Sequence, residues 1–317
     1  GLGDVYKRQD YTYAAGYNVV DFEDNENAFP ILYVFDRQSG DFEKKNELPN
    51  GEIIKFILAE NNGNQNIYYF KRCLPISKEV SLYKYNLAKQ EEKKVCANWL
   101  NKFYNASPGM AIGMIENTLC GLEASVDKGF EIVSFDDNGK TTLLKKAFPY
   151  DRINGKYVTQ FYCEDDNLLF NYDSKSRCVL VTGSIRFEDD RESFDCLLSL
   201  NMKTGDIKLL RDEQNDAYYY EVLNTKQGFV LLEIGKDIDK TIVKTINPET
   251  LETTSILAEI DEYITSAIYN EKTNSIYWAS SNGTSEDYVM EYTFDSKEVS
   301  VSNSSLPYIE ALFSTKY

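Results

Sequence analysis

The sequence predicts an all-β fold, a β-propeller of four-stranded antiparallel blades, and two observations support this class. The first is a pattern that recurs six times: a short strand of alternating apolar residues, a turn rich in Asp or Asn, and a strand of alternating charged residues. The second is that no stretch of about 10 to 15 residues shows a sustained helical period. Four strands every ~45–50 residues are typical of propeller blades. Six blades are therefore expected.

The six hairpins are aligned on the residue before each turn. These residues are Phe35, Tyr85, Phe135, Leu200, Ile246 and Phe294, at intervals of 50, 50, 65, 46 and 48 residues. A second hairpin precedes the first in each unit, as in SAIYNEKTNSIYWASS from Ser266. The long interval contains an insertion, residues 148–167, with an extra strand-like piece, YVTQFYCED. Two stacked sandwiches are the alternative architecture for this pattern.

The two ends of the chain carry separate expectations. Residues 4–9 read DVYKRQ, which the codons GAT GTG TAT AAG AGA CAG encode, and this string resembles a translated transposase adaptor. We therefore interpret residues 1–9 as a non-native segment and residues 10–317 as a single propeller domain. The tail from Tyr308 is expected to supply the inner strand of the first blade and so close the ring. With a truncated N-terminus, seven blades remain an alternative.

Composition excludes several classes of function. The chain has 51 acidic and 34 basic residues, a formal net charge of −17, and no cluster of basic residues that would attract nucleic acid or an anionic membrane surface. It contains no histidine, which removes Ser-His-Asp and Cys-His catalysis and most catalytic zinc sites. No apolar run approaches the ~20 residues of a transmembrane helix.

No cofactor or metal is expected. The six cysteines show no CxxC or CxC spacing, so a zinc or iron–sulfur site has no support, and buried free thiols are favoured over disulfides. The acidic stretches DFEDNEN from Asp21 and FEDDRES from Phe187 could offer oxygen ligands to calcium. Neither follows a calcium-loop pattern, and solvated acidic loops explain both.

One stretch points to a family. SIYWASSNGTSEDYVMEYTF, through Ile276, Tyr277 and Trp278, resembles the YWTD-type propellers of the lipoprotein-receptor class and the bacterial extracytoplasmic propellers related to them and to TolB. Residues 67–69 are a weaker copy. Ala279 and Ser280 replace the Thr-Asp of the signature, and the TolB-type Trp-Ser-Pro-Asp-Gly turn is absent. The resemblance implies a six-bladed propeller, and function does not follow from a fold.

The candidate site lies on long, irregular loops at one face of the propeller. The loops from Asn98, Phe148 and Ile185 are longer than the uniform turns of the opposite face, and loop length often marks function. Two of them carry an Asp-Arg pair beside an aromatic residue, an arrangement that can hold a sugar or a peptide carboxylate. The predicted binding residues are Tyr150, Asp151, Arg152, Asp190 and Arg191. The alternative is a surface salt-bridge network between the two loops.

The absence of any catalytic motif favours a non-catalytic propeller that binds or scaffolds a protein, peptide or carbohydrate and is exported or attached to the surface of a bacterium. The alternative is a carboxylate-dependent, carbohydrate-active propeller enzyme, a hydrolase or a lyase. Two carboxylates within about 10 Å across the central channel would favour the enzyme.

Overall fold

A computed structural model describes most of the chain. The described residues are 12–17, 30–61, 64–72, 80–96, 110–116, 118–125, 128–135, 141–163, 169–211, 217–235, 240–264, 267–280, 286–306, 309 and 311–314. The interpretation of residues 1–9, the acidic stretch from Asp21 and the loop from Asn98 to Gly109 lie outside these ranges. No helix of the described part is long and apolar enough to cross a membrane.

The described strands form six antiparallel sheets. The first has the order β25-β1-β2-β3, with strands Ala311–Ser314, Thr12–Tyr17, Pro30–Asp36 and Asp41–Glu47. The second runs β4-β5-β6-β7, with strands Glu52–Asn61, Asn64–Arg72, Val80–Asn86 and Glu91–Cys96. The third runs β8-β9-β10-β11, with strands Met110–Ile115, Thr118–Ser125, Gly129–Phe135 and Thr141–Phe148.

The remaining sheets follow in chain order. The fourth contains β12 to β16, with strands Val158–Tyr162, Phe170–Asp173, Cys178–Phe187, Phe194–Asn201 and Ile207–Arg211. The fifth runs β17-β18-β19-β20, with strands Ala217–Thr225, Gly228–Gly235, Thr241–Ile246 and Thr253–Ile260. The sixth runs β21-β22-β23-β24, with strands Ala267–Asn270, Ser275–Ser280, Tyr288–Thr293 and Glu298–Val301.

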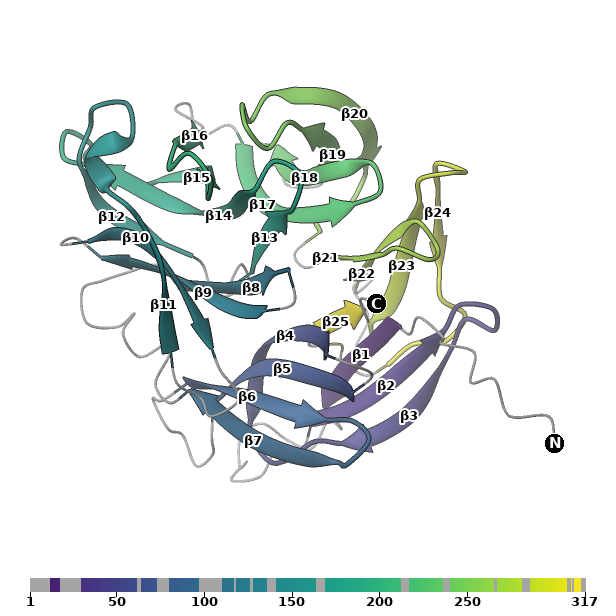
Figure 1. Ribbon diagram of the computed structural model, residues 1–317. Coiled ribbons are helices and arrows are strands. Elements are labelled where there is room, and N and C mark those ends of the chain that lie inside the picture. Colours follow the sequence, from purple (N-terminus) through teal and green to yellow (C-terminus); the bar gives the residue numbers. More distant parts are fainter. Residues whose placement is uncertain are drawn as a thin grey trace.

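The sheets are arranged as in a propeller, which confirms the predicted fold class (Figure 1). Strands β8, β13, β17, β21, β25 and β4 lie toward the middle of the molecule, and neighbouring inner strands such as β8 and β13, β13 and β17, and β17 and β21 lie side by side. The tail strand β25 pairs with β1, with Leu312 opposite Ala14, so one sheet combines segments from both ends of the chain. This matches the role expected for the tail.

The inserted segment before the fourth sheet forms part of that sheet. Strand β14 is ten residues long. Strand β12 pairs with its C-terminal half, and β13 pairs with its N-terminal half. Tyr162 lies opposite Ser184, and Asp173 lies opposite Cys178. The extra strand predicted in the long interval is therefore β12, which together with β13 forms an inner strand divided into two pieces.

The turns between the third and fourth strands share one hydrogen-bonding pattern. In each described turn, a residue at or next to the end of the third strand accepts, through its carbonyl, the N–H of the residue four positions later at 2.7–2.8 Å. The accepting residues are Asp36, Asn86, Asn201, Asn247 and Thr293. The residue that donates this N–H has a positive φ, which is 72° for Gly40 and 59° for Lys297. Asp and Asn side chains also accept backbone N–H groups within the turn, as Asn201 does from Lys203 at 2.9 Å. The turn-rich sequence pattern thus has a direct structural cause.

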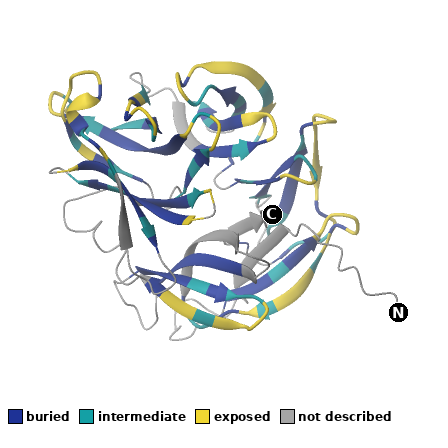
Figure 2. Cartoon of the chain, viewed as in Figure 1, coloured by how far each residue is buried: buried dark blue, intermediate teal, exposed yellow. Residues whose placement is uncertain are grey.

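The apolar core lies between neighbouring sheets, because each strand presents alternate side chains to the two faces of its sheet. One cluster extends across the second, third and fourth sheets, and another joins the fifth to the sixth through Leu232, Trp278 and Tyr292. A smaller one joins the sixth sheet to the first through Tyr277 and Phe35. Buried residues follow middle strands such as β6, β9, β14 and β18, whereas the outer strands β3 and β24 are exposed (Figure 2).

Candidate functional site

The two described loops predicted to carry the site lie next to each other. Both leave the same end of the propeller, because β11 ends at Phe148 and β14 ends at Phe187. The backbone N–H of Glu188 donates to the carbonyl of Tyr157 at 3.1 Å, and Lys156 forms an exposed ion pair with Asp189 at 3.2 Å. The structure therefore brings the two loops together, and a salt bridge joins them.

Tyr150 is a buried packing residue at the start of the first loop. It begins a short 3-10 helix, η2 (Tyr150–Arg152), and only 4% of its surface is exposed. Its ring packs edge-on against Phe130, with centroids 4.9 Å apart, and against Tyr157 at 6.3 Å. Burial raises the pKa of its hydroxyl, so this side chain is neutral at physiological pH.

The other residues of the first pair are at the surface. Asp151 and Arg152 are exposed. Arg152 extends toward the β15–β16 turn, where its Nη1 would lie 3.5 Å from a Cβ placed on Gly205. The side chains of this pair are therefore accessible to a ligand that approaches over the surface.

Asp190 is held inside the second loop by an arginine that was not among the predicted site residues. Its Oδ2 accepts the backbone N–H of Phe187 at 3.1 Å and an Nη1 hydrogen of Arg211 at 2.5 Å. Both charged side chains are only 12% exposed. The guanidinium lies between two aromatic rings, 5.3 Å from the centroid of Phe187 and 4.5 Å from that of Phe194. Arg191, the next residue in sequence, is exposed.

The five predicted residues therefore have different surroundings. Asp190 is engaged with Arg211 and the backbone, and Tyr150 is buried among aromatic rings. The exposed members are Asp151, Arg152 and Arg191. Sequence reasoning missed Arg211 because it is the last residue of a strand, and its approach to Asp190 depends on the pairing of β15 with β16.

A second group of polar side chains lies on the inner strands. Glu221 on β17 is 6% exposed, and its Oε2 accepts the backbone N–H of Ala267, the first residue of β21, at 2.7 Å. Asn171 on β13 donates to the carbonyl of Val222 at 2.5 Å, and Asn224 on β17 donates to the carbonyl of Tyr172 at 3.2 Å. These polar groups join three neighbouring inner strands beside the middle of the propeller.

Glu221 and Glu291 are the buried carboxylates of the described part of the chain, and only Glu221 lies on an inner strand. The sequence contains a signal for it, because an acidic residue in the strand AYYYEVLNT stands between residues of high β-propensity. A buried carboxylate is costly unless it is hydrogen-bonded, so such a residue usually has a specific task.

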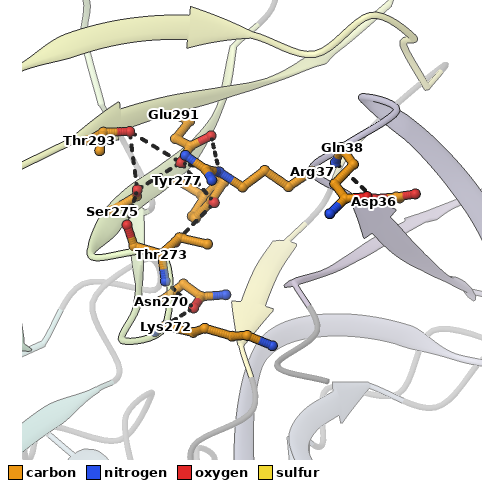
Figure 3. A network of polar contacts seen from close by, with 10 residues as sticks. All are labelled: Asp36, Arg37, Gln38, Asn270, Lys272, Thr273, Ser275, Tyr277, Glu291 and Thr293. Atoms are coloured by element: carbon orange, nitrogen blue, oxygen red, sulfur yellow. Dashed lines mark hydrogen bonds and ion pairs between the residues drawn. The ribbon is translucent and has the colours of Figure 1, made fainter. Parts of the chain in front are cut away.

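Glu291 is the centre of a network between the sixth and first sheets (Figure 3). Its carboxylate accepts hydrogen bonds from Ser275 at 2.7 Å, from Tyr277 at 3.0 Å and from Nε of Arg37 at 2.8 Å. Arg37 belongs to the β2–β3 turn, so the network joins two sheets whose sequences are far apart. With its acceptor sites occupied by these donors, Glu291 has a structural environment.

Among the residues that the structure describes, no group of three or more His, Cys, Asp or Glu side chains could hold a metal ion. Four described cysteines, Cys120, Cys163, Cys178 and Cys196, are buried and free.

Comparison with known proteins gives similarity of fold. No protein-family model matches the sequence, and no curated protein matches it. The periplasmic gluconolactonase PpgL of Pseudomonas aeruginosa superposes with a TM-score of 0.54 at 9% identity, covering 97% of this chain and 99% of that one. A 6-phosphogluconolactonase candidate from Bacteroides fragilis superposes with a TM-score of 0.54 at 9% identity, covering 98% and 99%.

TolB from Acinetobacter baumannii superposes with a TM-score of 0.55 at 12% identity over 91% of this chain. This chain spans only 62% of the length of TolB. The chain thus has TolB-like and lactonase-like structural neighbours, as the resemblance to TolB-related propellers implied.

These neighbours correct the expected function. The interpretation as a non-catalytic binding or scaffolding propeller is wrong, because the structures that match this chain over nearly its whole length include one described as a periplasmic gluconolactonase and one described as a 6-phosphogluconolactonase candidate. The inference had relied on the lack of a linear catalytic motif. In a propeller, polar groups from separate blades meet at the inner strands, as Glu221 and the backbone of Ala267 do here, so no contiguous motif is required.

Proposed function

We propose that the protein is a carboxylate-dependent propeller hydrolase that opens a sugar-derived lactone. The observation that carries this proposal is Glu221, a buried carboxylate on an inner strand that is hydrogen-bonded to the next inner strand. The end-to-end similarity to two propellers described as gluconolactonases supports the substrate class. The chain has no histidine, so a carboxylate is the natural general base.

The reaction requires a base and a donor to the developing oxyanion. In the proposed mechanism Glu221 takes a proton from water, whose oxygen attacks the lactone carbonyl carbon. The tetrahedral intermediate collapses by breaking the ring C–O bond, and the leaving alcohol oxygen takes the proton back from Glu221. Asn171 and Asn224 are not this donor, because their amides bond between β17 and the fourth sheet whereas Glu221 faces the sixth sheet.

The loop residues predicted from the sequence are proposed to bind the substrate. Asp151, Arg152 and Arg191 are exposed at the end of the propeller where β17 begins, and they can donate to or accept from the sugar hydroxyls and carbonyl. Tyr150 and Asp190 support them, because Tyr150 packs beneath the first loop and Asp190 holds the second through Arg211.

The finer parts of the family resemblance also belong to this proposal. Each of the six sheets is taken as one blade, and residues 276–280 as a divergent YWTD-type segment. An extracytoplasmic location is proposed as well, supported by the periplasmic gluconolactonase among the structural neighbours. Fractionation of cells that carry the intact gene tests the location, and recovery in the cytosol would contradict it.

The activity is tested by following acid release from glucono-1,5-lactone, 6-phosphogluconolactone and galactonolactone in a pH-stat, against the spontaneous rate. Glu221→Gln keeps an acceptor for Ala267 N–H but cannot accept a proton, so kcat is expected to fall about 100-fold or more. Glu249→Gln, on an exposed turn, is the matched control and keeps full activity. No acceleration with any of the three lactones, or full activity of Glu221→Gln, would refute the proposal.

A further inference from the structure

The outer strands of the propeller differ in how they are protected from pairing with other chains. Natural sheet edges are commonly protected by lysines, bulges or prolines. The outer strands of the first two sheets follow this rule, since β3 reads DFEKKNE and β7 reads EEKKVC. The outer strands of the fifth and sixth sheets contain no basic residue, since β20 reads TTSILAEI and β24 reads EVSV.

Strand β24 is the flatter of these two edges. The pairing of β20 with β19 shifts register twice, whereas the pairing of β24 with β23 runs without a shift. Among the described strands none pairs with the outer side of β24, which ends its sheet. Figure 2 draws β24 as exposed, and Figure 1 places it on the outer side of the molecule. An exposed edge without a bulge can accept another strand.

The hydrogen-bonding register shows which backbone groups of β24 face outward. Ser302 donates its N–H to the carbonyl of Val289 at 2.8 Å, so Ser302 faces β23 with its backbone groups. In an antiparallel pair these positions alternate, so Ser300 also faces β23. The N–H and C=O groups of Val299 and Val301 therefore point away from the sheet. These backbone groups are hydrogen-bond donors and acceptors to which another strand can pair along this edge.

The side chains of the same two residues extend an apolar core. Val299 lies opposite Tyr292, and Val301 lies opposite Met290, so each pair shares one face of the sheet. Tyr292 and Met290 belong to the core between the fifth and sixth sheets, and the Tyr292 hydroxyl donates to the carbonyl of Leu257 on β20. Val299 and Val301 are nevertheless 46% and 50% exposed.

The described part of the chain has five large apolar residues that are exposed. Three of them lie on the outer strands β20 and β24, namely Ile256, Val299 and Val301. Ile256 on β20 lies opposite Lys244, on the face of the fifth sheet that is turned away from the sixth. The apolar surface that continues past the edge of the core is therefore that of Val299 and Val301.

We propose that the outer edge of β24 binds an extended segment of a partner protein, which adds to the sixth sheet as a further strand. Its apolar side chains, at alternate positions, would cover Val299 and Val301 and extend the core between the sheets. Its other positions would be basic, because Glu298 is the charged residue of β24 and the chain carries a net charge of −17. The same charge disfavours a second copy of this chain as the occupant. The proposal is independent of the proposed enzyme activity.

The test uses a synthetic peptide, acetyl-KVKVKV-amide, titrated into the whole protein and followed by calorimetry. The control peptide has the same sequence with N-methyl groups on alternate residues, which keeps the charge but removes the donors on one edge. If the peptide adds to β24, N-methylation is expected to weaken binding about 10-fold or more, since several backbone hydrogen bonds are lost.

Two variants locate the binding. Val301→Pro removes an outward-facing N–H and leaves the hydrogen bonds to β23 in place, so it should weaken peptide binding about 10-fold. Val301→Thr keeps the N–H and the β-branched shape, so its effect should be smaller. The circular dichroism spectrum and unfolding midpoint of each variant show whether the fold is retained. Equal binding of both peptides, or equal binding by Val301→Pro, would overturn the proposal. So would a dimer in solution that Val301→Pro dissociates, because the occupant would then be a second copy.

Discussion

The carboxylate of Glu291 accepts a hydrogen bond from Nε of Arg37 at 2.8 Å, although the two residues are 254 positions apart in the sequence. This contact joins the sixth sheet to the first, which is also the sheet in which β25 pairs with β1. Close by, the backbone N–H groups of Asn303 and Ser304 donate to the carbonyl of Gly40 at 3.1 and 3.2 Å. Two sets of contacts therefore hold the ends of the chain together.

The first prediction concerns this network. Glu291→Ala leaves the Ser275 and Tyr277 hydroxyls and Arg37 without their shared acceptor, so the free energy of unfolding should fall by about 3 kcal/mol. Arg37→Met should cost less, about 1 kcal/mol, because the Arg37 side chain is 51% exposed and partly solvated. Urea unfolding followed by tryptophan fluorescence measures both.

The control for this prediction is an exposed ion pair in the same sheet. Lys45 and Glu43 are 3.3 Å apart with 42% and 71% of their side chains exposed. Lys45→Met should change the free energy of unfolding by less than about 0.5 kcal/mol. A loss at Glu291→Ala no larger than that of Lys45→Met would show that the network does not stabilise ring closure.

The second prediction concerns the loop that Asp190 organises. Arg211→Met removes the guanidinium from between Phe187 and Phe194 and leaves the Asp190 carboxylate 12% exposed without its cation, so the free energy of unfolding should fall by about 2–4 kcal/mol. Lys156→Gln, which breaks the exposed pair with Asp189, should leave the free energy of unfolding almost unchanged. Chemical denaturation of both variants compares them, and equal losses would contradict the difference in burial.

The third prediction concerns the close approach of the third and fourth sheets. A Cβ on Gly113 would lie 2.4 Å from the backbone oxygen of Phe170 and 2.7 Å from its ring. Gly113→Ala should therefore push the inner strands β8 and β13 apart and cost about 1–3 kcal/mol. Gly235→Ala is the matched control, because nothing lies within 4 Å of its Cβ position. A thermal shift assay is sufficient, and a similar melting temperature for both variants would contradict the close packing.

The fourth prediction concerns the buried thiols. Burial raises the pKa of Cys120 to about 11 and that of Cys163 to about 12, against an ordinary value of 9.0. The folded protein therefore holds both as thiols, and iodoacetamide at pH 8 should modify neither until urea is added. Mass spectrometry of the peptides measures the labelling. Rapid labelling of Cys163 in the folded protein would disprove its burial.

The same shifts predict how stability changes with pH. A thiol whose pKa is raised in the folded state contributes its full stabilisation below about pH 9, and this contribution is lost as pH rises through the folded pKa. The advantage of wild type over Cys163→Ala in free energy of unfolding should therefore decrease between pH 9 and about pH 12. A constant difference over this range would show that Cys163 titrates normally in the folded state.

Local patterns in the sequence were sufficient to predict the repeating hairpins. The turn residues Asp36, Asn86, Asn201 and Asn247 act within four residues of themselves, so their effect can be read from the sequence. The alternation of apolar residues in strands such as β5 and β6 likewise depends on neighbours along the chain. The role of the tail as an inner strand followed from counting hairpins.

The candidate site could be predicted only in part. The loops around Tyr150 and Asp190 were located by their length, and the structure places them together. The partner of Asp190 was not predicted, because Arg211 lies 21 residues away and approaches it only across a strand pair. Glu221 was missed for the same reason, since its hydrogen bond to Ala267 joins inner strands 46 residues apart.

The sequence by itself determined that this chain forms short antiparallel strands in repeated hairpins, because turn chemistry and strand alternation act over a few residues. The tertiary structure alone decided which charged groups are paired and buried. Glu291 with Arg37, Asp190 with Arg211, and Glu221 with Ala267 each meet across sheets or strands that are distant in the chain. Contacts of this kind depend on the angle at which one sheet packs on the next, and no local pattern encodes that angle.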